Sequence, residues 1–316
     1  MPRAPLTPAA GYRRVLAAVL LFSLNPVLYR QVPLDPLTIL WTVSAIAVLA
    51  LAGGRLWQGS AAALFTRPAE LRSILLLTVW FTVNNGLYLT ALQKTTIANA
   101  TMTHYLAPLF VAGLAWPLLG ERLQPRAVAA MGTAAAGVAV MVAGSGLSLA
   151  DAHFVGLLCG AGSAVFFALE VVQKKILAPS APADVITVHY LVLAVLVLAP
   201  FARPFTLTSL RHAEMGLLLF AGVVTTALAL YLFASALPAV SVQHAAVISY
   251  LEPLGAIAWG LVLIREVPDR FGLAGGGLVL VGILLIVGAR SPGPRRAFDP
   301  TSHDPSPPGI DRLRGS

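Results

Sequence analysis

The sequence predicts an all-α integral membrane protein of ten transmembrane helices, arranged as two inverted five-helix repeats. Three observations support this fold class. The first is composition, because the 316-residue chain is 58% apolar and only 11% charged, whereas a soluble domain averages about 25% charged residues. The second is that the apolar residues form ten runs of about 20, the length of a helix that crosses a bilayer. These runs are roughly 14–30, 37–57, 71–92, 96–119, 126–144, 154–173, 184–202, 213–236, 241–264 and 271–289.

The third observation is an internal repeat. The stretch "HYLAPLFVAGLAWPLLGER" begins at His104, and "SYLEPLGAIAWGLVLIREV" begins at Ser249, 145 positions later. The same offset pairs other residues along the chain, among them Arg30 with Lys175, Glu121 with Glu266, Gly132 with Gly277 and Gly137 with Gly282. Each half therefore holds five spans, and because five is odd the second half enters from the opposite side of the membrane. Inverted repeats of this kind are common among secondary transporters.

The spans divide the chain into four segments. We expect a cytoplasmic N-terminus at residues 1–13, a first five-helix repeat at 14–144, a second at 154–289, and a tail at 290–316. The tail is rich in Pro, Ser and charged residues, which is typical of disordered segments. The first span follows Arg13 and Arg14 but has no small-residue cleavage site after it, so we interpret it as a retained helix.

The basic residues predict the orientation. With the N-terminus in the cytoplasm, 15 of the 21 Lys and Arg residues face the cytoplasm, as the positive-inside rule requires. The bias of the interhelical loops is strong in the first half and lost in the second. We therefore expect a multi-pass protein of the inner (plasma) membrane with both termini in the cytoplasm. This placement accounts for the net charge of +8 without a nucleic-acid partner.

Sequence signals of enzymes are absent. The chain has no Gly-rich phosphate loop ending in Lys-Ser or Lys-Thr, no HExxH and no GxSxG. It has no soluble region large enough for an ATPase domain. The single cysteine, Cys159, excludes an internal disulfide and a metal site built on cysteine. We therefore predict no catalytic residue, no metal ligand and no cofactor.

Polar side chains within the spans are the candidate substrate-binding residues, because such groups usually face the bundle interior or water. Helical spacing places Asn84 and Tyr88 on one face, with Trp80 one turn away. A cavity with aromatic walls and a few amide or carboxylate groups suits a small amphipathic solute, although packing or interfacial anchoring also explains single aromatic residues. The predicted binding residues are Ser23, Asn25, Trp80, Asn84, Asn85, Tyr88, Thr101, His104, Tyr105, Glu170, Ser249, Tyr250 and Glu252.

Three prolines within the spans predict bends. A proline cannot donate to the carbonyl four residues before it, and an unpaired carbonyl in lipid must face another helix, water or a ligand. Each bend is either a static kink satisfied by a neighbouring hydroxyl or a hinge with an acceptor for an ammonium group. The prolines are Pro26, Pro108 and Pro253, and they release the carbonyls of Phe22, His104 and Ser249.

Two carboxylates lie well inside the spans. Glu170 has Lys174 four residues later, so the two can pair on one helix face. Glu252 has no basic residue three or four positions away. Four roles therefore stay open for Glu252: a protonated acid, a hydrogen bond to a neighbouring helix, a substrate ammonium site, or proton exchange.

Small residues fill the fifth and tenth spans, including "AAMGTAAAGVAVMVAGSG" and "GLAGGGLVLVG". Such faces allow helices to approach closely. The sequence leaves open whether this contact lies within one chain or between the protomers of an oligomer.

The five-plus-five spans, with "GER" closing the fourth and "IRE" closing the ninth, resemble the drug/metabolite transporter superfamily in its EamA-type branch. The resemblance covers about residues 12–289. It implies a central cavity walled partly by the fourth and ninth helices, peripheral helices closing each half, and export of amino acids or related metabolites. One departure is that Arg265 stands where the first repeat has Gly120.

These observations favour a secondary transporter that exports amino acids or related small metabolites by alternating access. The alternative within transport is a carrier of organic cations or drugs, for which Glu252 and the aromatic residues would form a cation site. A non-transport membrane enzyme or scaffold would require clustered catalytic groups or large interaction loops. The expected partners are a small-molecule substrate and the lipid bilayer.

Overall fold

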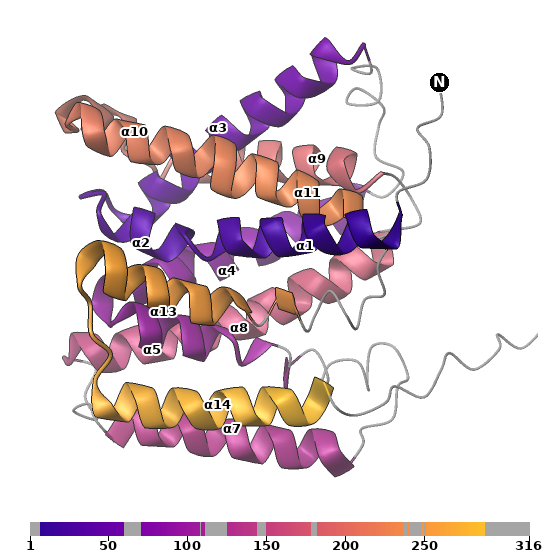
Figure 1. Ribbon diagram of the computed structural model, residues 1–316. Helices are drawn as coiled ribbons and strands as arrows, with labels where there is room; N and C mark the ends of the chain where they lie inside the picture. The colour runs from indigo at the N-terminus through magenta and orange to yellow at the C-terminus, as the bar shows by residue number, and fades with distance from the viewer. Residues whose placement is uncertain are drawn as a thin grey trace, which may run out of the picture.

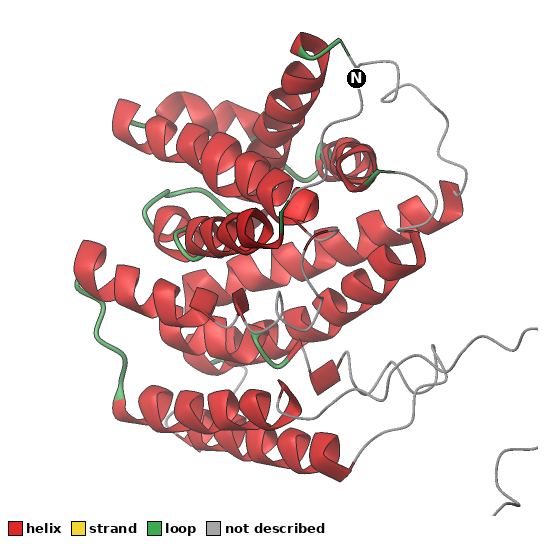
Figure 2. Ribbon diagram, turned by 45° about the vertical axis from the view of Figure 1, so that its right-hand side comes forward, coloured by secondary structure: helices red, strands yellow, loops and turns green. Residues whose placement is uncertain are grey.

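The computed structural model describes residues 7–59, 71–107, 109–110, 125–143, 150–177, 182–236, 239, 248–249 and 251–287. Within these ranges the regular elements are all helices, and no strand occurs among them (Figures 1 and 2). This confirms the all-α prediction.

The first half contributes the helices of the first five spans. Capping side chains set where several of them begin, because the first backbone N–H groups of a helix need acceptors. Thr7, Asp35 and Thr96 each accept from the N–H three residues on. The helices are α1 (Pro8–Phe22), α2 (Asn25–Arg30), α3 (Pro36–Trp57), α4 (Leu71–Lys94), α5 (Ile97–His104) and α7 (Pro125–Ala143).

The second half contributes the remaining five spans. The eighth span of the chain runs without interruption through an α-helix, a π-helical stretch and a second α-helix. The elements are α8 (Ala152–Leu177), α9 (Ala183–Leu198), the 3-10 helix η2 (Pro204–Ser209), α10 (His212–Phe220), the π-helix η3 (Ala221–Leu228), α11 (Ala229–Ala236), α13 (Leu251–Ile264) and α14 (Arg270–Val287).

Eight described helices are apolar enough to lie in a membrane. Four of them are also long enough to cross it: Pro36–Trp57, Leu71–Lys94, Ala152–Lys174 and His212–Phe233. Shorter apolar helices cover Gly132–Ala143, Val185–Leu198, Leu251–Ile264 and Arg270–Gly282. Large apolar side chains stand on their outer faces, including Leu49, Leu196 and Val262, each more than 60% exposed, as expected where lipid replaces water as the solvent.

The helix contacts follow the repeat. In the repeat, α4 is equivalent to the eighth span, which includes α11, and α8 is equivalent to the first span, which includes α1. The contact of α4 with α8 is therefore equivalent to the contact of α11 with α1, and both contacts occur. In the same way, the contact of α4 with α9 is equivalent to the contact of η3 with α3, and both occur. Two further contacts each join a helix to its own equivalent in the other half: α3 with α9, and α7 with α14. This pairwise exchange is what two repeats related by a two-fold axis produce.

Helices α7 and α14 lie side by side at the periphery of the bundle (Figure 1). Their axes approach closely at two glycines. A methyl group on Gly137 would collide with the carbonyl oxygen of Gly275, and one on Gly275 would collide with that of Gly137. The small-residue faces of the fifth and tenth spans therefore meet within one chain.

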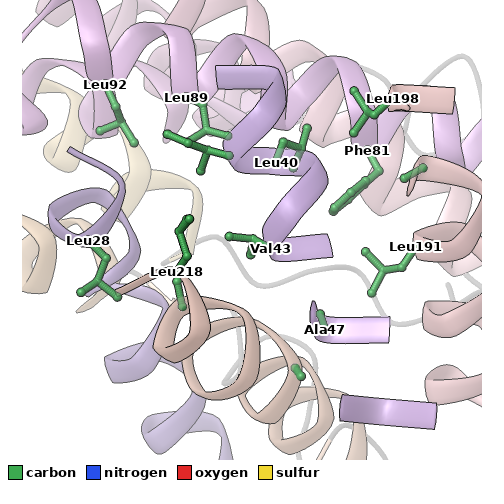
Figure 3. Close-up of a cluster of buried hydrophobic side chains, with 14 of the residues drawn as sticks. Leu28, Leu40, Val43, Ala47, Phe81, Leu89, Leu92, Leu191, Leu198 and Leu218 are labelled. Carbon is green, nitrogen blue, oxygen red and sulfur yellow. The ribbon is translucent and has the colours of Figure 1, made fainter. Parts of the chain in front are cut away.

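The main apolar core joins the two halves around α3. Figure 3 shows Leu40 and Val43 of α3 among Phe81 of α4, Leu191 of α9 and Leu218 of α10. These side chains are buried, and the ring of Phe81 lies 5.0 Å from that of Tyr190. The core holds α2, α3, α4, α9 and α10 together beside the polar residues described below.

The first span is interrupted at Ser23 and Leu24. Helix α1 ends at Phe22 and α2 begins at Asn25, with Pro26 in its first turn. Proline fits the first turn of a helix because its missing N–H has no intrahelical partner there. The predicted bend at Pro26 is thus seen as a break between two helices.

Candidate functional site

A polar cluster lies where α4, α5 and α8 meet. The hydroxyls of Tyr88 and Thr101 are hydrogen-bonded at 3.2 Å. The imidazole of His104 stacks on Tyr88, with ring centroids 4.5 Å apart. Its Nδ1 shares a 2.8 Å hydrogen bond with the hydroxyl of Ser163. These contacts bring together three predicted binding residues and orient the histidine ring.

Tyr105 connects this cluster to the ninth span. Its hydroxyl donates to the backbone carbonyl of Ser249 at 3.2 Å and lies within hydrogen-bonding reach of the half-buried side chain of Glu252. Glu252 also interacts electrostatically with Tyr88. A carboxylate of the second half therefore lies beside the phenol of Tyr105 in the first half. We refer to Tyr88, Thr101, His104, Tyr105, Ser249 and Glu252 as the central cluster.

One of the predicted prolines, Pro253, belongs to this region. Pro253 stands in the first turn of α13, and the carbonyl that it releases, that of Ser249, is the one that Tyr105 bonds. Pro108 and Tyr250 lie outside the described residues.

The break in the first span lies next to the second half. The indole N–H of Trp259 donates to the hydroxyl of Ser23 at 3.1 Å, and that hydroxyl donates to the carbonyl of Leu20 at 2.8 Å. The amide of Asn25 donates to the carbonyl of Thr225 at 3.2 Å, and the hydroxyl of Thr225 donates back to the Asn25 side chain. Ser23 is therefore hydrogen-bonded to α13, and Asn25 to the π-helical stretch η3.

Both halves of the chain are similar to one known protein family. The model of the EamA-like transporter family matches residues 10–143 and again residues 154–288. The chain belongs to the EamA-like transporter family. This EamA-like protein is thus a member of a membrane transporter family, and its two matched segments are its two repeats.

Individual relatives agree with this assignment. An uncharacterized transporter of Archaeoglobus fulgidus is 29% identical over 214 residues, 68% of this chain and 76% of the relative. The uncharacterized transporter YwfM of Bacillus subtilis is 28% identical, covering 64% and 69%. The pseudopaline exporter CntI of Pseudomonas aeruginosa is 32% identical, covering 63% and 69%. A solved crystal structure at 21% identity covers 89% of this chain and 97% of its own with a TM-score of 0.62, which shows a shared fold.

A second polar group of the EamA-like protein lies between α4 and α8. The amide of Asn84 donates to Glu170 at 2.9 Å, and Lys174 lies 2.6 Å from the other oxygen of that carboxylate. The Glu170 side chain is only 4% exposed. The ammonium of Lys174 also lies 5.3 Å from the centroid of the Tyr190 ring. Glu170 thus forms the ion pair with Lys174 that their spacing suggested, within a network that joins both halves.

The remaining predicted residues make more local contacts. Trp80 packs on Phe166 of α8, with ring centroids 5.9 Å apart. The amide of Asn85 donates to the carbonyl of Phe81, four residues back on its own helix, at 2.9 Å. Neither contact reaches the central cluster.

Three contact residues were not among the predicted binding set: Ser163, Thr225 and Trp259. Ser163 is a hydroxyl among small and apolar residues of the sixth span, and Gly160 one turn before it lets α5 approach, since a methyl group there would collide with Thr103. A serine beside a helix-packing glycine was the available signal. Thr225 and Trp259 are polar side chains within the eighth and ninth spans, and only their partners distinguish them from the other polar residues there.

The described residues contain no group of three or more His, Cys, Asp or Glu side chains arranged to hold a metal ion. A cavity of about 240 Å³ lies away from the central cluster, between α3, α9 and the eighth span. Apolar side chains line it, with Arg55, Gln58 and Tyr231 as polar members.

Proposed function

We propose that the EamA-like protein is a secondary transporter that exports amino acids or related small metabolites by alternating access. The supporting observation is the position of Tyr105, whose hydroxyl bonds the carbonyl of Ser249 and lies beside Glu252 across the junction of the two repeats. A site at the repeat interface near mid-membrane is where transporters of this construction bind their solutes. The substrate proposed is a small molecule, and the lipid bilayer is the other expected partner.

The chemistry of the cluster suits an amino acid. A carboxylate pairs with an ammonium group, and the phenol and imidazole rings provide apolar faces with hydrogen-bonding edges. Outside the cluster, one turn before Tyr88 on α4, the carbonyl oxygen of Asn84 is buried and has no hydrogen-bond partner among the described residues, so it is an acceptor for a solute N–H or a water. In this proposal Glu252 binds the ammonium group, and the aromatic rings select the size of the side chain.

Direction and orientation are part of the same proposal. A relative at 32% identity is by name an exporter, that of pseudopaline in Pseudomonas aeruginosa, which favours export. The positive-inside distribution favours the inner membrane with both termini in the cytoplasm. Reporter fusions at Arg126 and Arg270 should then report opposite compartments, and fusions that report the same side would contradict the inverted arrangement.

Flux into proteoliposomes tests the function directly. The purified protein is supplied with a panel of amino acids and a panel of cationic dyes, and initial rates are measured at two pH values. Saturable amino acid flux that falls in Glu252→Gln is the expected result. Glu214→Gln is the matched control, because Glu214 pairs with Arg211, the N-cap residue of α10, and not with a residue of the cluster.

The same assay separates the alternative functions. The aromatic rings of the central cluster would also suit an organic cation, and flux of dyes without flux of amino acids would favour a drug or organic cation carrier. The absence of flux for every solute tested, with the protein folded, would reject transport and favour a scaffold. Unchanged kinetics in Glu252→Gln would reduce this residue to a structural hydrogen-bonding group.

A further inference from the structure

Arg30, at the end of α2, connects three segments at one end of the bundle. Its guanidinium lies 3.6 Å from the carboxylate of Glu266, in the connection between α13 and α14. The same group donates to the carbonyls of Leu92 at 2.5 Å and of Thr95. Arg30 lies in the first matched repeat and Glu266 in the second, so this ion pair joins the two halves of the chain.

Glu266 also acts on the beginning of α5. Its other carboxylate oxygen accepts from the backbone N–H of Ile97, the first residue of that helix. An acidic side chain is favourable at this position because the helix N-terminus carries partial positive charge. Only 16% of the Glu266 side chain is exposed, and 31% of that of Arg30. A partly buried pair is screened less than a pair on an open surface.

A second connection between the repeats lies beside the first. The amide of Asn99 on α5 lies 3.4 Å from Asp269 and 3.4 Å from the ring of His153. His153 in turn shares a 2.7 Å hydrogen bond with Thr95. Helix α2 and the connection from α13 to α14 both lie at the left end of the molecule in Figure 1, opposite the start of α1. With the N-terminus in the cytoplasm, this end is extracytoplasmic.

We propose that the contact of Arg30 with Glu266, supported by the contact of Asn99 with Asp269, is an extracytoplasmic latch that opens when the solute is released. The inference rests on the proposed function, because alternating access requires the end that faces release to separate. It assigns a role to two charged residues that lie outside the central cluster. In the sequence, the 145-residue offset places a basic residue, Lys175, and an acidic residue, Glu121, at the equivalent positions. The pair of charges is therefore a feature of the repeat.

A buried residue of α13, between Glu252 and Glu266 in the sequence, can be replaced by a cysteine that reports opening of the latch. Ala256 on α13 is fully buried, one turn before Gly260, which packs against Ile97 of α5. We would place Ala256→Cys in a Cys159→Ala background, so that it is the sole thiol. Its labelling rate by a membrane-impermeant maleimide, added to intact cells, reports access from the extracytoplasmic side and needs no knowledge of the substrate.

Opening of the latch should raise this labelling rate. Arg30→Gln and Glu266→Gln should each increase it by about fivefold or more, the usual size of a coupling of this kind. The double variant should label no faster than the faster single variant, because both changes break the same ion pair between the repeats. Arg30→Lys retains the charge and should label more slowly than Arg30→Gln. Arg211→Gln is the matched control, since it removes an ion pair between the N-cap residue of α10 and Glu214 in its first turn, and it should leave the rate unchanged.

A cross-link provides the complementary test. Arg30→Cys and Glu266→Cys, in the Cys159→Ala background, are joined by a reducible bifunctional thiol reagent. The cross-linked protein should lose flux, and reduction should restore it. Labelling that stays at the parental rate in both glutamine variants, or full flux through the cross-linked protein, would overturn the latch. A parent protein without flux for any solute would instead count against the proposed function, and the labelling experiment would still decide on the latch.

Discussion

The phenol of Tyr105 donates a 3.2 Å hydrogen bond to the backbone carbonyl of Ser249. Pro253, four residues after Ser249, has no N–H for this carbonyl, so a side chain of the first repeat replaces a missing helical bond of the second. The two residues belong to the two copies of the repeated motif. One hydrogen bond thus supports the start of α13 and holds a phenol beside Glu252.

Removing that hydroxyl should weaken both the fold and transport. Tyr105→Phe leaves the Ser249 carbonyl without this donor, at a cost of about 1 kcal/mol in stability, and a similar loss at the site would lower flux about fivefold. Thermal unfolding in detergent and initial flux in proteoliposomes measure the two effects. Tyr12→Phe, on α1 outside the central cluster, is the control. Wild-type values for both quantities in Tyr105→Phe would show that the hydrogen bond is dispensable.

The two carboxylates within the spans should respond differently to loss of charge. Glu170 binds both Asn84 and Lys174, so Glu170→Gln should lower stability by about 1–3 kcal/mol, because it weakens buried hydrogen bonds. Glu252→Gln should retain stability and change flux. Denaturation curves and flux measured on the same preparations separate these outcomes. A folded, stable Glu170→Gln variant without flux would move Glu170 into the substrate site.

The break in the first span should contribute to turnover. Pro26→Ala restores an N–H, which favours a continuous helix from α1 into α2 and opposes movement at Ser23 and Leu24. Maximal flux should fall severalfold while the KM stays close to that of the wild type. The measurement is flux against substrate concentration. A raised KM with unchanged maximal flux would indicate that the break shapes the binding site and does not act as a hinge.

Arg265 should be replaceable with a gain in stability. Its φ of 56° is left-handed, a conformation that costs a residue with a side chain roughly 1–2 kcal/mol. The first repeat has Gly120 at the equivalent position. Arg265→Gly should therefore raise the free energy of unfolding by about 1 kcal/mol, after the greater flexibility of glycine in the unfolded chain is included. Arg265→Ala, which keeps the Cβ atom and removes the charge, should give no such gain, and an equal gain would attribute the effect to charge.

Asp269 should make stability depend on pH. Partial burial acts to raise its pKa, but the N–H groups of Gly272 and Phe271 outweigh this and hold the pKa below its ordinary value. The carboxylate therefore stabilises the folded state above the ordinary pKa of about 3.9, and this contribution is lost as the pH falls through the lowered value.

Asp269→Ala should accordingly lower the free energy of unfolding by about 1 kcal/mol at pH 7. At acid pH the free energies of unfolding of the variant and the wild type should differ by less. Thermal unfolding between neutral and acid pH gives the comparison. Asp269→Asn keeps a capping side chain without a titrating group and should not show this dependence. A pH-independent difference between wild type and alanine variant would contradict the role of the carboxylate.

The sequence was sufficient for the all-α fold, the two repeats and the interruption at Pro26, because each depends on local composition or on a fixed offset. The pairing of Glu170 with Lys174 followed from helical spacing. The partners of Tyr105 and Asn25 could not be predicted from the sequence. Periodicity defines the faces of a helix, but it does not show which faces of distant helices meet. The π-helical stretch at Ala221–Leu228 had no sequence signal either, because its residues are also compatible with an ordinary α-helix.

The exchange of helix contacts between the halves has a consequence for the conformational cycle. Whatever local geometry one half adopts is available to the other, because equivalent helices meet equivalent neighbours. A conformer open toward the opposite side can therefore be built by giving each half the coordinates of its counterpart. Such a swapped structure would identify in advance the distances that change most between the two conformers, and spin-label pairs placed at those positions would measure them.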